Sequence, residues 1–180
     1  SGTADALQNP GAPLEIDSLP VGKTLGMIGM CCCPGRIEHH TDGVARSRNL
    51  DEDLMLIRDW RPDQVISLVE AHEFNHLGVS ELPETFSAEF KWQHWPLQDL
   101  SAPKASDQNE TEINEWFSAL NEGQRLLFHC AAGLGRTGTL AARLLIMSGN
   151  PPDIAISMVR AVRPGTVESK AQENFLKSLK

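Results

Sequence analysis

Apolar residues recur along this chain with two different periods, and the segments of the two kinds alternate. Short, largely apolar runs are typical of buried strands, and they lie at 25–33, 64–69, 90–95 and 125–129. Longer segments place apolar residues three and four positions apart, as helices with a buried face do, and they lie at 50–60, 110–120 and 137–147. Further helices are predicted at 72–77, from Pro151 to about 163, and from about Ser169 onward.

Strands that alternate with helices predict an α/β fold. We expect a single domain over 19–180 with a central, mostly parallel twisted sheet of about four or five strands, flanked by helices. Residues 1–18 are rich in Gly, Pro, Ala and Asp, so they are predicted to form a flexible N-terminal arm.

Composition and charge narrow the class of protein. With 180 residues, 41% of them hydrophobic and 22% charged, the chain is long enough for one ordinary core. No run of 18 apolar residues occurs, which argues against a membrane span. The net charge of −8 argues against a nucleic-acid partner or an anionic membrane. It leaves a small phosphate site open, because a few N–H groups and one arginine can hold an anion locally.

The four cysteines do not form a disulfide framework. Cys31, Cys32 and Cys33 are consecutive, and Cys130 stands alone, so a reducing, cytoplasmic location is predicted. The triplet is expected to pack in the first strand as small apolar side chains. The alternative is that these thiols are redox partners of Cys130.

The stretch LLFHCAAGLGRTGTLAARLL carries the chemistry. It places His129 and Cys130 at the end of a strand, then five residues, then Arg136 and Thr137 at the start of a helix. In such a loop the backbone N–H groups converge on one anion, helped by the positive end of the helix. The predicted phosphate-binding residues are Ala131, Ala132, Gly133, Leu134, Gly135 and Arg136.

The same positive field favours a thiolate over a thiol at Cys130. We therefore expect the Cys130 sulfur to attack phosphorus in line, while Arg136 holds two phosphoryl oxygens through the transition state. His129 is expected to orient the loop and the cysteine. Thr137 is expected to donate its hydroxyl to the sulfur, which would help the sulfur leave the phosphocysteine.

Three other readings compete for this loop. Gly133, Gly135 and Gly138 match a dinucleotide fingerprint, but the match lies too near the end of the chain for the rest of such a domain. An inert core cysteine would make the surrounding pattern a coincidence. Another enzyme that combines a thiol with an oxyanion site, such as a sulfurtransferase or an arsenate reductase, is less consistent with the Arg-Thr ending.

HCAAGLGRTG resembles the signature of the protein tyrosine phosphatase superfamily, in its dual-specificity branch. LGMIGMCCCPG and HWPLQDLSAP resemble the kinase-associated phosphatases, also called the cyclin-dependent kinase inhibitor 3 family, whereas VRPGTVESKAQENF resembles the mitotic-exit dual-specificity phosphatases. The similarity covers about 22–180. It implies a phosphatase that uses a phosphocysteine intermediate and needs no cofactor or metal.

Such a reaction needs an acid to protonate the leaving group. In the kinase-associated branch a Pro-x-x-Asp pattern carries this acid, and Pro96 to Asp99 matches it. Asp99 is therefore the predicted acid, with Asp107 as the runner-up. The family positions the attacking water with glutamines on a late loop. Gln172 matches one of them, whereas Glu168 stands where tyrosine phosphatases carry the other.

A formal zinc-peptidase motif also occurs, at His72-Glu73-Phe74-Asn75-His76. The helix is stopped by Gly78 before it can present a longer face, so a surface turn is the preferred interpretation. A zinc peptidase stays open as an alternative.

The sequence as a whole predicts a monomeric phosphatase that acts on phosphorylated protein or peptide, on phosphotyrosine and, as an open extension, on phosphoserine and phosphothreonine. Two alternatives remain. One is a phosphoinositide or other small phosphoester phosphatase, although such relatives place lysines in the loop and this chain does not. The other is a module that binds a phosphorylated partner with low turnover.

Overall fold

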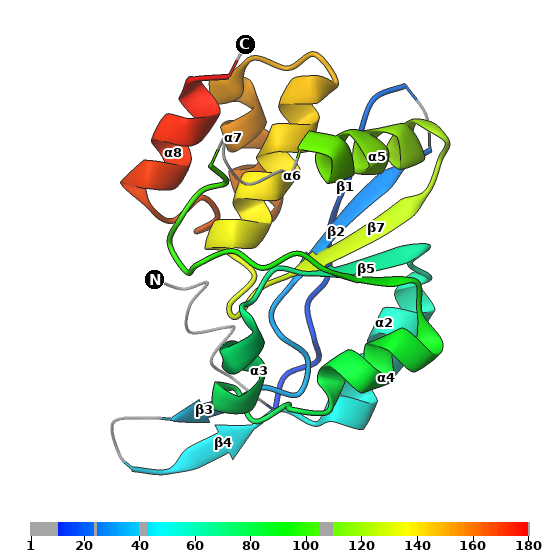
Figure 1. The fold of residues 1–180 in the computed structure, drawn as a ribbon, viewed down its shortest axis with the longest axis vertical. Helices are drawn as coiled ribbons and strands as arrows, with labels where there is room; N and C mark the ends of the chain where they lie inside the picture. The colour runs from blue at the N-terminus through cyan, green and yellow to red at the C-terminus, as the bar shows by residue number, and fades with distance from the viewer. Residues whose placement is uncertain (1–10, 24, 40–42, 105–109, 180) are drawn as a thin grey trace.

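A computed structural model describes residues 11–23, 25–39, 43–104 and 110–179. A five-stranded sheet runs through the middle of the molecule in the order β1-β2-β7-β5-β6 (Figure 1). Its strands are β1 (Asp17–Pro20), β2 (Met27–Cys31), β7 (Arg125–His129), β5 (Gln64–Ser67) and β6 (Trp92–His94). All neighbours pair in parallel except β1, which is antiparallel to β2. The α/β fold with a mostly parallel sheet is thus confirmed.

Helices cover both faces of this sheet (Figure 1). On one face lie α5 (Glu110–Asn121), α6 (Gly135–Met147), α7 (Pro152–Val162) and α8 (Lys170–Lys177). On the other lie α2 (Leu50–Trp60) and α4 (Leu82–Glu89), with α3 (Ala71–His76) and the hairpin of β3 (Ile37–His39) and β4 (Ala45–Ser47) at one end. Because both faces are covered, consecutive residues of β5 and β7 are buried, rather than every second residue.

The ends of the helices follow local capping chemistry. Asn49 caps α2 by accepting a hydrogen bond from the N–H of Glu52, and Asp51 and Glu52 add negative charge to the first turn. The observed bounds of α2 therefore agree with the helix predicted over 50–60. Gly78 ends the α3 region with a φ of +75°, and a side chain there would collide with Ile37.

Four elements were not predicted: β1, α4 and the two strands of the β3-β4 hairpin. The polar sequence of β1 carries no strand periodicity, yet Asp17 and Ser18 pair with β2. The arm predicted over 1–18 therefore ends earlier than expected, since Leu14 is also buried and the carbonyl of Ala12 accepts a hydrogen bond from Arg48. Helix α4 and the β3-β4 hairpin were missed because each presents few apolar residues to the core.

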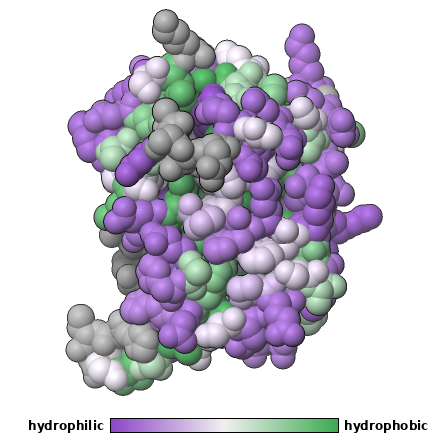
Figure 2. Space-filling model, in the orientation of Figure 1, coloured by the Kyte–Doolittle hydropathy of each residue, from purple (hydrophilic) through white to green (hydrophobic). Residues whose placement is uncertain are grey.

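The outer surface matches the charged composition. Figure 2 shows a face dominated by hydrophilic residues, with hydrophobic patches that are small and separate. None of the helices in the described part of the chain is long and apolar enough to cross a bilayer.

A glycine contact at the start of β2 gives a test of the packing. A Cβ placed on Gly26 would lie 2.1 Å from the carbonyl oxygen of Leu120, at the end of α5. Because that obstacle is backbone, we expect Gly26→Ala to lower the free energy of unfolding by about 3 kcal/mol. Gly123→Ala is the matched control, since Gly123 has a φ of +87° but no atom within 4 Å of its Cβ position. It should cost about 1 kcal/mol. Equal urea midpoints for the two variants would contradict the contact.

Candidate active site

The phosphate loop, residues 130–136, lies at the carboxyl end of β7 and leads directly into α6. The loop turns sharply at Gly133, which has a φ of +73°. A Cβ at this position would lie 2.3 Å from the carbonyl oxygen of Cys31, at the end of the neighbouring strand β2. Only glycine therefore allows the loop to lie this close to the sheet.

The carbonyl groups of residues 131–134 in the phosphate loop have hydrogen-bond partners outside the loop. Arg163 donates to the oxygens of Gly133 and Ala132 at 2.8 and 3.2 Å, and Arg36 donates to the oxygen of Ala131 at 2.7 Å. The N–H of Val167 donates to the oxygen of Leu134 at 3.1 Å. Because carbonyl and N–H point in opposite directions along the chain, the N–H groups turn toward the inside of the loop, as an anion site requires.

Arg163 is itself held by the first strand. It is almost fully buried, and its Nη1 lies 2.9 Å from a carboxylate oxygen of Asp17 in β1. The unpredicted strand thus supports the loop through a partly buried ion pair. This link joins residues that are 146 positions apart in the chain.

The sulfur of Cys130 lies inside the loop and is nearly inaccessible to solvent. The N–H of Gly133 donates to it at 3.2 Å. A hydrogen bond from an amide to sulfur is stronger when the sulfur carries a negative charge. The arrangement therefore has the polarity expected for a nucleophilic thiolate.

His129 is held by a chain of three hydrogen bonds. Its Nδ1 lies 3.1 Å from the carbonyl oxygen of Cys130, and its Nε2 lies 2.5 Å from the hydroxyl of Ser67. The indole N–H of Trp92 donates to the same hydroxyl at 2.8 Å. A carbonyl can only accept, so Nδ1 carries the proton and Nε2 accepts from Ser67. Complete burial lowers the pKa of His129 to about 4, which keeps the ring neutral. The ring therefore donates its Nδ1 proton to the Cys130 carbonyl.

Arg136 is oriented by Glu73. Its Nη1 and Nη2 donate to the two carboxylate oxygens of Glu73 at 2.7 and 3.0 Å, and Nη1 also donates to the carbonyl of Leu97 at 3.0 Å. Burial works against ionisation, but the hydrogen bonds to Glu73 and the negative charges around the guanidinium raise the pKa of Arg136. Within the described residues its Nε has no hydrogen-bond partner. This Nε is a buried donor without a partner among those residues, and a phosphoryl oxygen would satisfy it.

The role of Glu73 was missed in the sequence because the His-Glu-x-x-His pattern suggested a different chemistry. The structure uses the carboxylate to pair Arg136 instead, and His72 and His76 are exposed on a helix of six residues. Glu73 is thus taken up by an arginine and does not serve as a peptidase base. One argument could have found this pairing from the sequence: a buried Arg136 requires a carboxylate partner.

Asp99 lies on the acid loop, residues 96–104, above the guanidinium of Arg136. One of its carboxylate oxygens lies 3.5 Å from Nη2 of Arg136, and its side chain is 64% exposed. The loop is tied to the start of α8, because the Ser169 hydroxyl donates to the Leu100 carbonyl at 2.7 Å and the Gln172 amide donates to the Ser101 carbonyl at 3.2 Å. The predicted acid and the predicted nucleophilic loop therefore meet. Asp107, the runner-up, lies outside the described residues.

Thr137 and Gln172 also lie at the loop, but their contacts differ from those expected. The Thr137 hydroxyl is buried, and no hydrogen-bond partner for it occurs in the described part of the chain, so the predicted bond to the Cys130 sulfur is not formed here. Gln172 is fully buried, and its side-chain amide would contact a Cβ on Gly135. Glu168 lies beside it, which is a placement that the sequence left open.

The cysteine triplet packs as predicted. Cys31, Cys32 and Cys33 are free and buried, and the N–H of Cys33 donates to the carbonyl of Ala131 in the phosphate loop. Burial raises the pKa of the Cys31 and Cys33 thiols well above the ordinary value. Buried, protonated thiols are poor nucleophiles, so these cysteines serve as packing and as backbone support.

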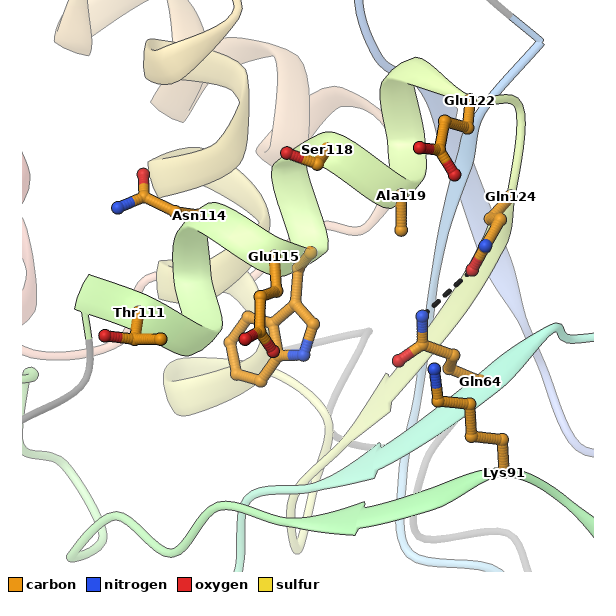
Figure 3. Close-up of a pocket in the computed structure, with 10 residues that line it drawn as sticks. Gln64, Lys91, Thr111, Asn114, Glu115, Ser118, Ala119, Glu122 and Gln124 are labelled. Carbon is orange, nitrogen blue, oxygen red and sulfur yellow. Dashed lines mark hydrogen bonds between the residues drawn. The ribbon is translucent and has the colours of Figure 1, made fainter.

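A groove lies at the end of the sheet opposite to the phosphate loop. This groove of about 590 Å³ is lined by Gln64, Lys91, Glu122 and Gln124, among others (Figure 3). The amide of Gln64 donates to the side-chain oxygen of Gln124 at 2.9 Å across it. Its lining residues come from α5 and from the amino ends of β5, β6 and β7, whereas Cys130 follows the carboxyl end of β7. The groove is therefore separate from the site.

Comparisons with known proteins show which family the chain resembles. A family model described as the DSP-PTPase phosphatase of polymorphic toxin systems matches residues 43–150. Receptor-type tyrosine-protein phosphatase H of Homo sapiens is 30% identical over 172 residues, which is 85% of this chain but 14% of that protein. Cyclin-dependent kinase inhibitor 3 of Mus musculus is 25% identical over 91% of this chain and 77% of that protein. The chain thus spans only about a seventh of the receptor-type relative.

Solved structures share the fold. A kinase-associated phosphatase with serine in place of its catalytic-site cysteine aligns with a TM-score of 0.79 and 23% identity, over 92% of this chain and 93% of the other. A structure described as the active form of Tk-PTP aligns with a TM-score of 0.65 and 29% identity, over 89% of this chain and 96% of the other.

The Glu73–Arg136 pair gives a test of the site. We expect Glu73→Gln to lower kcat/KM for an aryl phosphate about 100-fold, because the guanidinium loses the carboxylate that fixes its position. Stability should fall by about 2 kcal/mol, since one partner of a charged hydrogen bond is neutralised. Glu84→Gln, at an exposed position on α4, is the control. Unchanged or increased kcat/KM in Glu73→Gln would show that Glu73 does not position Arg136.

His129 gives a test by pH. Its pKa is about 4 in the folded protein and 6.5 as the ordinary value, so the unfolded chain binds more protons between these values. Stability should therefore fall as the pH is lowered through this window, by about 1.4 kcal/mol per pH unit, or about 2 kcal/mol between pH 7 and pH 5 from this group. An NMR titration of the ring should show no protonation above pH 5. A midpoint near 6.5 would contradict a buried neutral ring.

Proposed function

The chain belongs to the DSP-PTPase phosphatase family, and we propose that it hydrolyses phosphate monoesters on proteins, with Cys130 as nucleophile, Arg136 as phosphate ligand and Asp99 as acid. The observation that carries this proposal is the convergence of three groups. The Cys130 sulfur accepts an amide hydrogen bond from its own loop, the buried Nε of Arg136 has no hydrogen-bond partner among the described residues, and an Asp99 carboxylate oxygen lies 3.5 Å from Arg136.

In the first proposed step the Cys130 sulfur forms a bond to phosphorus and the ester oxygen leaves with the electron pair. Asp99 gives its proton to that oxygen, so that an alcohol or a phenol departs. The negative charge of the phosphoryl group is balanced by Arg136 and by the N–H groups of residues 131–136. This balance needs no metal ion or cofactor. In the second step water attacks the phosphocysteine, the sulfur leaves as thiolate, and inorganic phosphate is released.

Thr137 and Gln172 are assigned supporting roles within this proposal. A thiolate that forms as the sulfur leaves would give the Thr137 hydroxyl the hydrogen-bond acceptor that it lacks among the described residues. Gln172 holds the acid loop in place through Ser101. His129 fixes the position of the cysteine backbone.

The proposed substrates are phosphotyrosine and phosphoserine or phosphothreonine on protein partners. This class is supported by the family and by the loop itself, because Ala131, Ala132 and Leu134 add no positive charge for a second phosphate group. We propose that residues 19–180 form the phosphatase domain, that it acts as a monomer, and that it works in the reducing environment of the cytoplasm, where its four free cysteines would stay reduced.

Turnover of an aryl phosphate tests the function. Cys130→Ser should abolish turnover, because an alcohol in this position lacks the nucleophilicity of a thiolate. Asp99→Asn should lower kcat about 100- to 10,000-fold for a leaving group that needs a proton, and much less for an acidic phenol. Asp59→Asn, at an exposed position on α2, is the control for Asp99. Full activity in Cys130→Ser, or an absence of phosphocysteine in acid-quenched wild type by mass spectrometry, would refute the proposal.

A further inference from the structure

Asp99 lies in a short turn of the acid loop whose backbone conformation is costly. The N–H of Ser101 donates to the carbonyl of Gln98 at 3.1 Å, which closes a turn with Asp99 in its second position and Leu100 in its third. Leu100 has a φ of +63°, in the left-handed region that favours glycine. A leucine keeps such a conformation only where the surrounding structure holds it. The turn that carries the acid therefore needs contacts from outside the acid loop.

Hydrogen bonds to carbonyl groups on both sides of Asp99 hold its backbone in place. Before it in the chain, the carbonyl of Leu97 accepts from Nη1 of Arg136 at 3.0 Å. After it, the carbonyl of Leu100 accepts from the hydroxyl of Ser169 at 2.7 Å. Ser169 is the residue that precedes α8, and the acid loop passes beside this end of the helix (Figure 1). The acid is thus held from the phosphate loop on one side and from α8 on the other.

Gln172 strengthens the attachment on the α8 side. Its amide nitrogen donates to the carbonyl of Ser101 at 3.2 Å, and its side-chain oxygen accepts from the N–H of Ser169 at 3.1 Å. Because Gln172 is fully buried, its side chain is fixed by packing and joins these two residues at a set separation. The Ser169 hydroxyl is therefore presented to the turn by a rigid support.

This hydroxyl has two tasks that substitutions can separate. As the N-cap of α8, its oxygen accepts from the N–H of Gln172 at 3.1 Å. Because the carbonyl of Leu100 can only accept, the hydroxyl proton points to that carbonyl. Glycine is tolerated at an N-cap nearly as well as serine, but it has no hydroxyl to donate. Threonine keeps both the cap and the donor.

We propose that Ser169 is a positioning residue for the acid of the reaction, because it holds the Leu100 carbonyl and thereby keeps Asp99 within reach of the leaving-group oxygen. This inference rests on the proposed function. Ser169 takes no proton and forms no bond to the substrate, and the proton of the first step still passes from Asp99 to the ester oxygen. A displaced acid matters only where the leaving group needs a proton. Loss of the hydroxyl should therefore act in proportion to the basicity of the departing oxygen.

The test compares an aryl phosphate that releases a weakly acidic phenol with one that releases a strongly acidic phenol. The measured quantity is kcat/KM, which reports the steps through phosphocysteine formation. In Ser169→Gly it should fall about 10-fold for the weakly acidic phenol and stay within about twofold for the strongly acidic one. In Ser169→Thr it should stay within about twofold of wild type for both, because the donor is retained.

A double variant tests whether Ser169 acts through the acid. Adding Ser169→Gly to Asp99→Asn should change kcat/KM by less than about twofold for either phenol, because the acid that the hydroxyl positions is already absent. Ser178→Gly is the matched control and should behave as wild type. Ser178 lies at the other end of α8, where its hydroxyl donates to the carbonyl of Phe175 within the same helix.

An unchanged kcat/KM in Ser169→Gly would overturn the inference. So would an equal fall for the two phenols, which would indicate a displaced phosphate loop, or a Ser169→Thr variant as slow as Ser169→Gly. In each case the proposed function stands as long as Cys130→Ser is inactive and Asp99→Asn is slowed mainly for the weakly acidic phenol. If Cys130→Ser keeps full activity, the proposed function fails and the inference fails with it.

Discussion

The outward direction of the phosphate-loop carbonyls is the constraint on which the site depends. An anion site made of backbone N–H groups exists only if the opposing carbonyl groups find partners elsewhere, because an unsatisfied buried carbonyl costs about 1–3 kcal/mol. Here the partners are supplied from three directions: by Arg36 and the N–H of Cys33, by Arg163, and by the N–H of Val167. The chemistry of Cys130 is thus maintained by residues that never approach a substrate.

The phosphate loop and Arg136 are both held in place by a pair of a buried arginine and a carboxylate. A buried guanidinium is held by a carboxylate on one side and directs its remaining donors to a chosen target on the other. Asp17 holds Arg163, which donates to the loop carbonyls, and Glu73 holds Arg136, the proposed phosphate ligand. Each arginine keeps its charge because the carboxylate offsets the cost of its burial. A chain with a net charge of −8 thereby presents a local positive site to an anionic substrate.

Asp99 and Glu168 place two carboxylates beside the phosphate loop. Arg136 and the loop N–H groups compensate the substrate, and the two carboxylates remain coupled to each other. The tie between the acid loop and α8, through Ser169 and Gln172, holds the two groups at the same mouth.

The sequence alone determined the alternation of strands and helices, the bounds of α2, and the loop with Cys130 and Arg136. These features depend on periodicities and spacings of a few residues, so they can be read directly from the sequence. It also identified Asp99, although through a resemblance and not through local physics. The short strand β1 could not be predicted from the sequence. Its four residues show no apolar alternation, and it is stabilised by pairing with β2.

Only the tertiary structure decided which side chains serve the loop from far away in the chain. Glu73 pairs with Arg136 across 63 positions, Arg163 with Asp17 across 146, and Ser67 with His129 across 62. Such pairings depend on strand order and on the direction in which each side chain leaves its element, and no local pattern encodes either. The sequence therefore specified the reactive loop, while the fold determined what holds it in place and which carboxylates surround it.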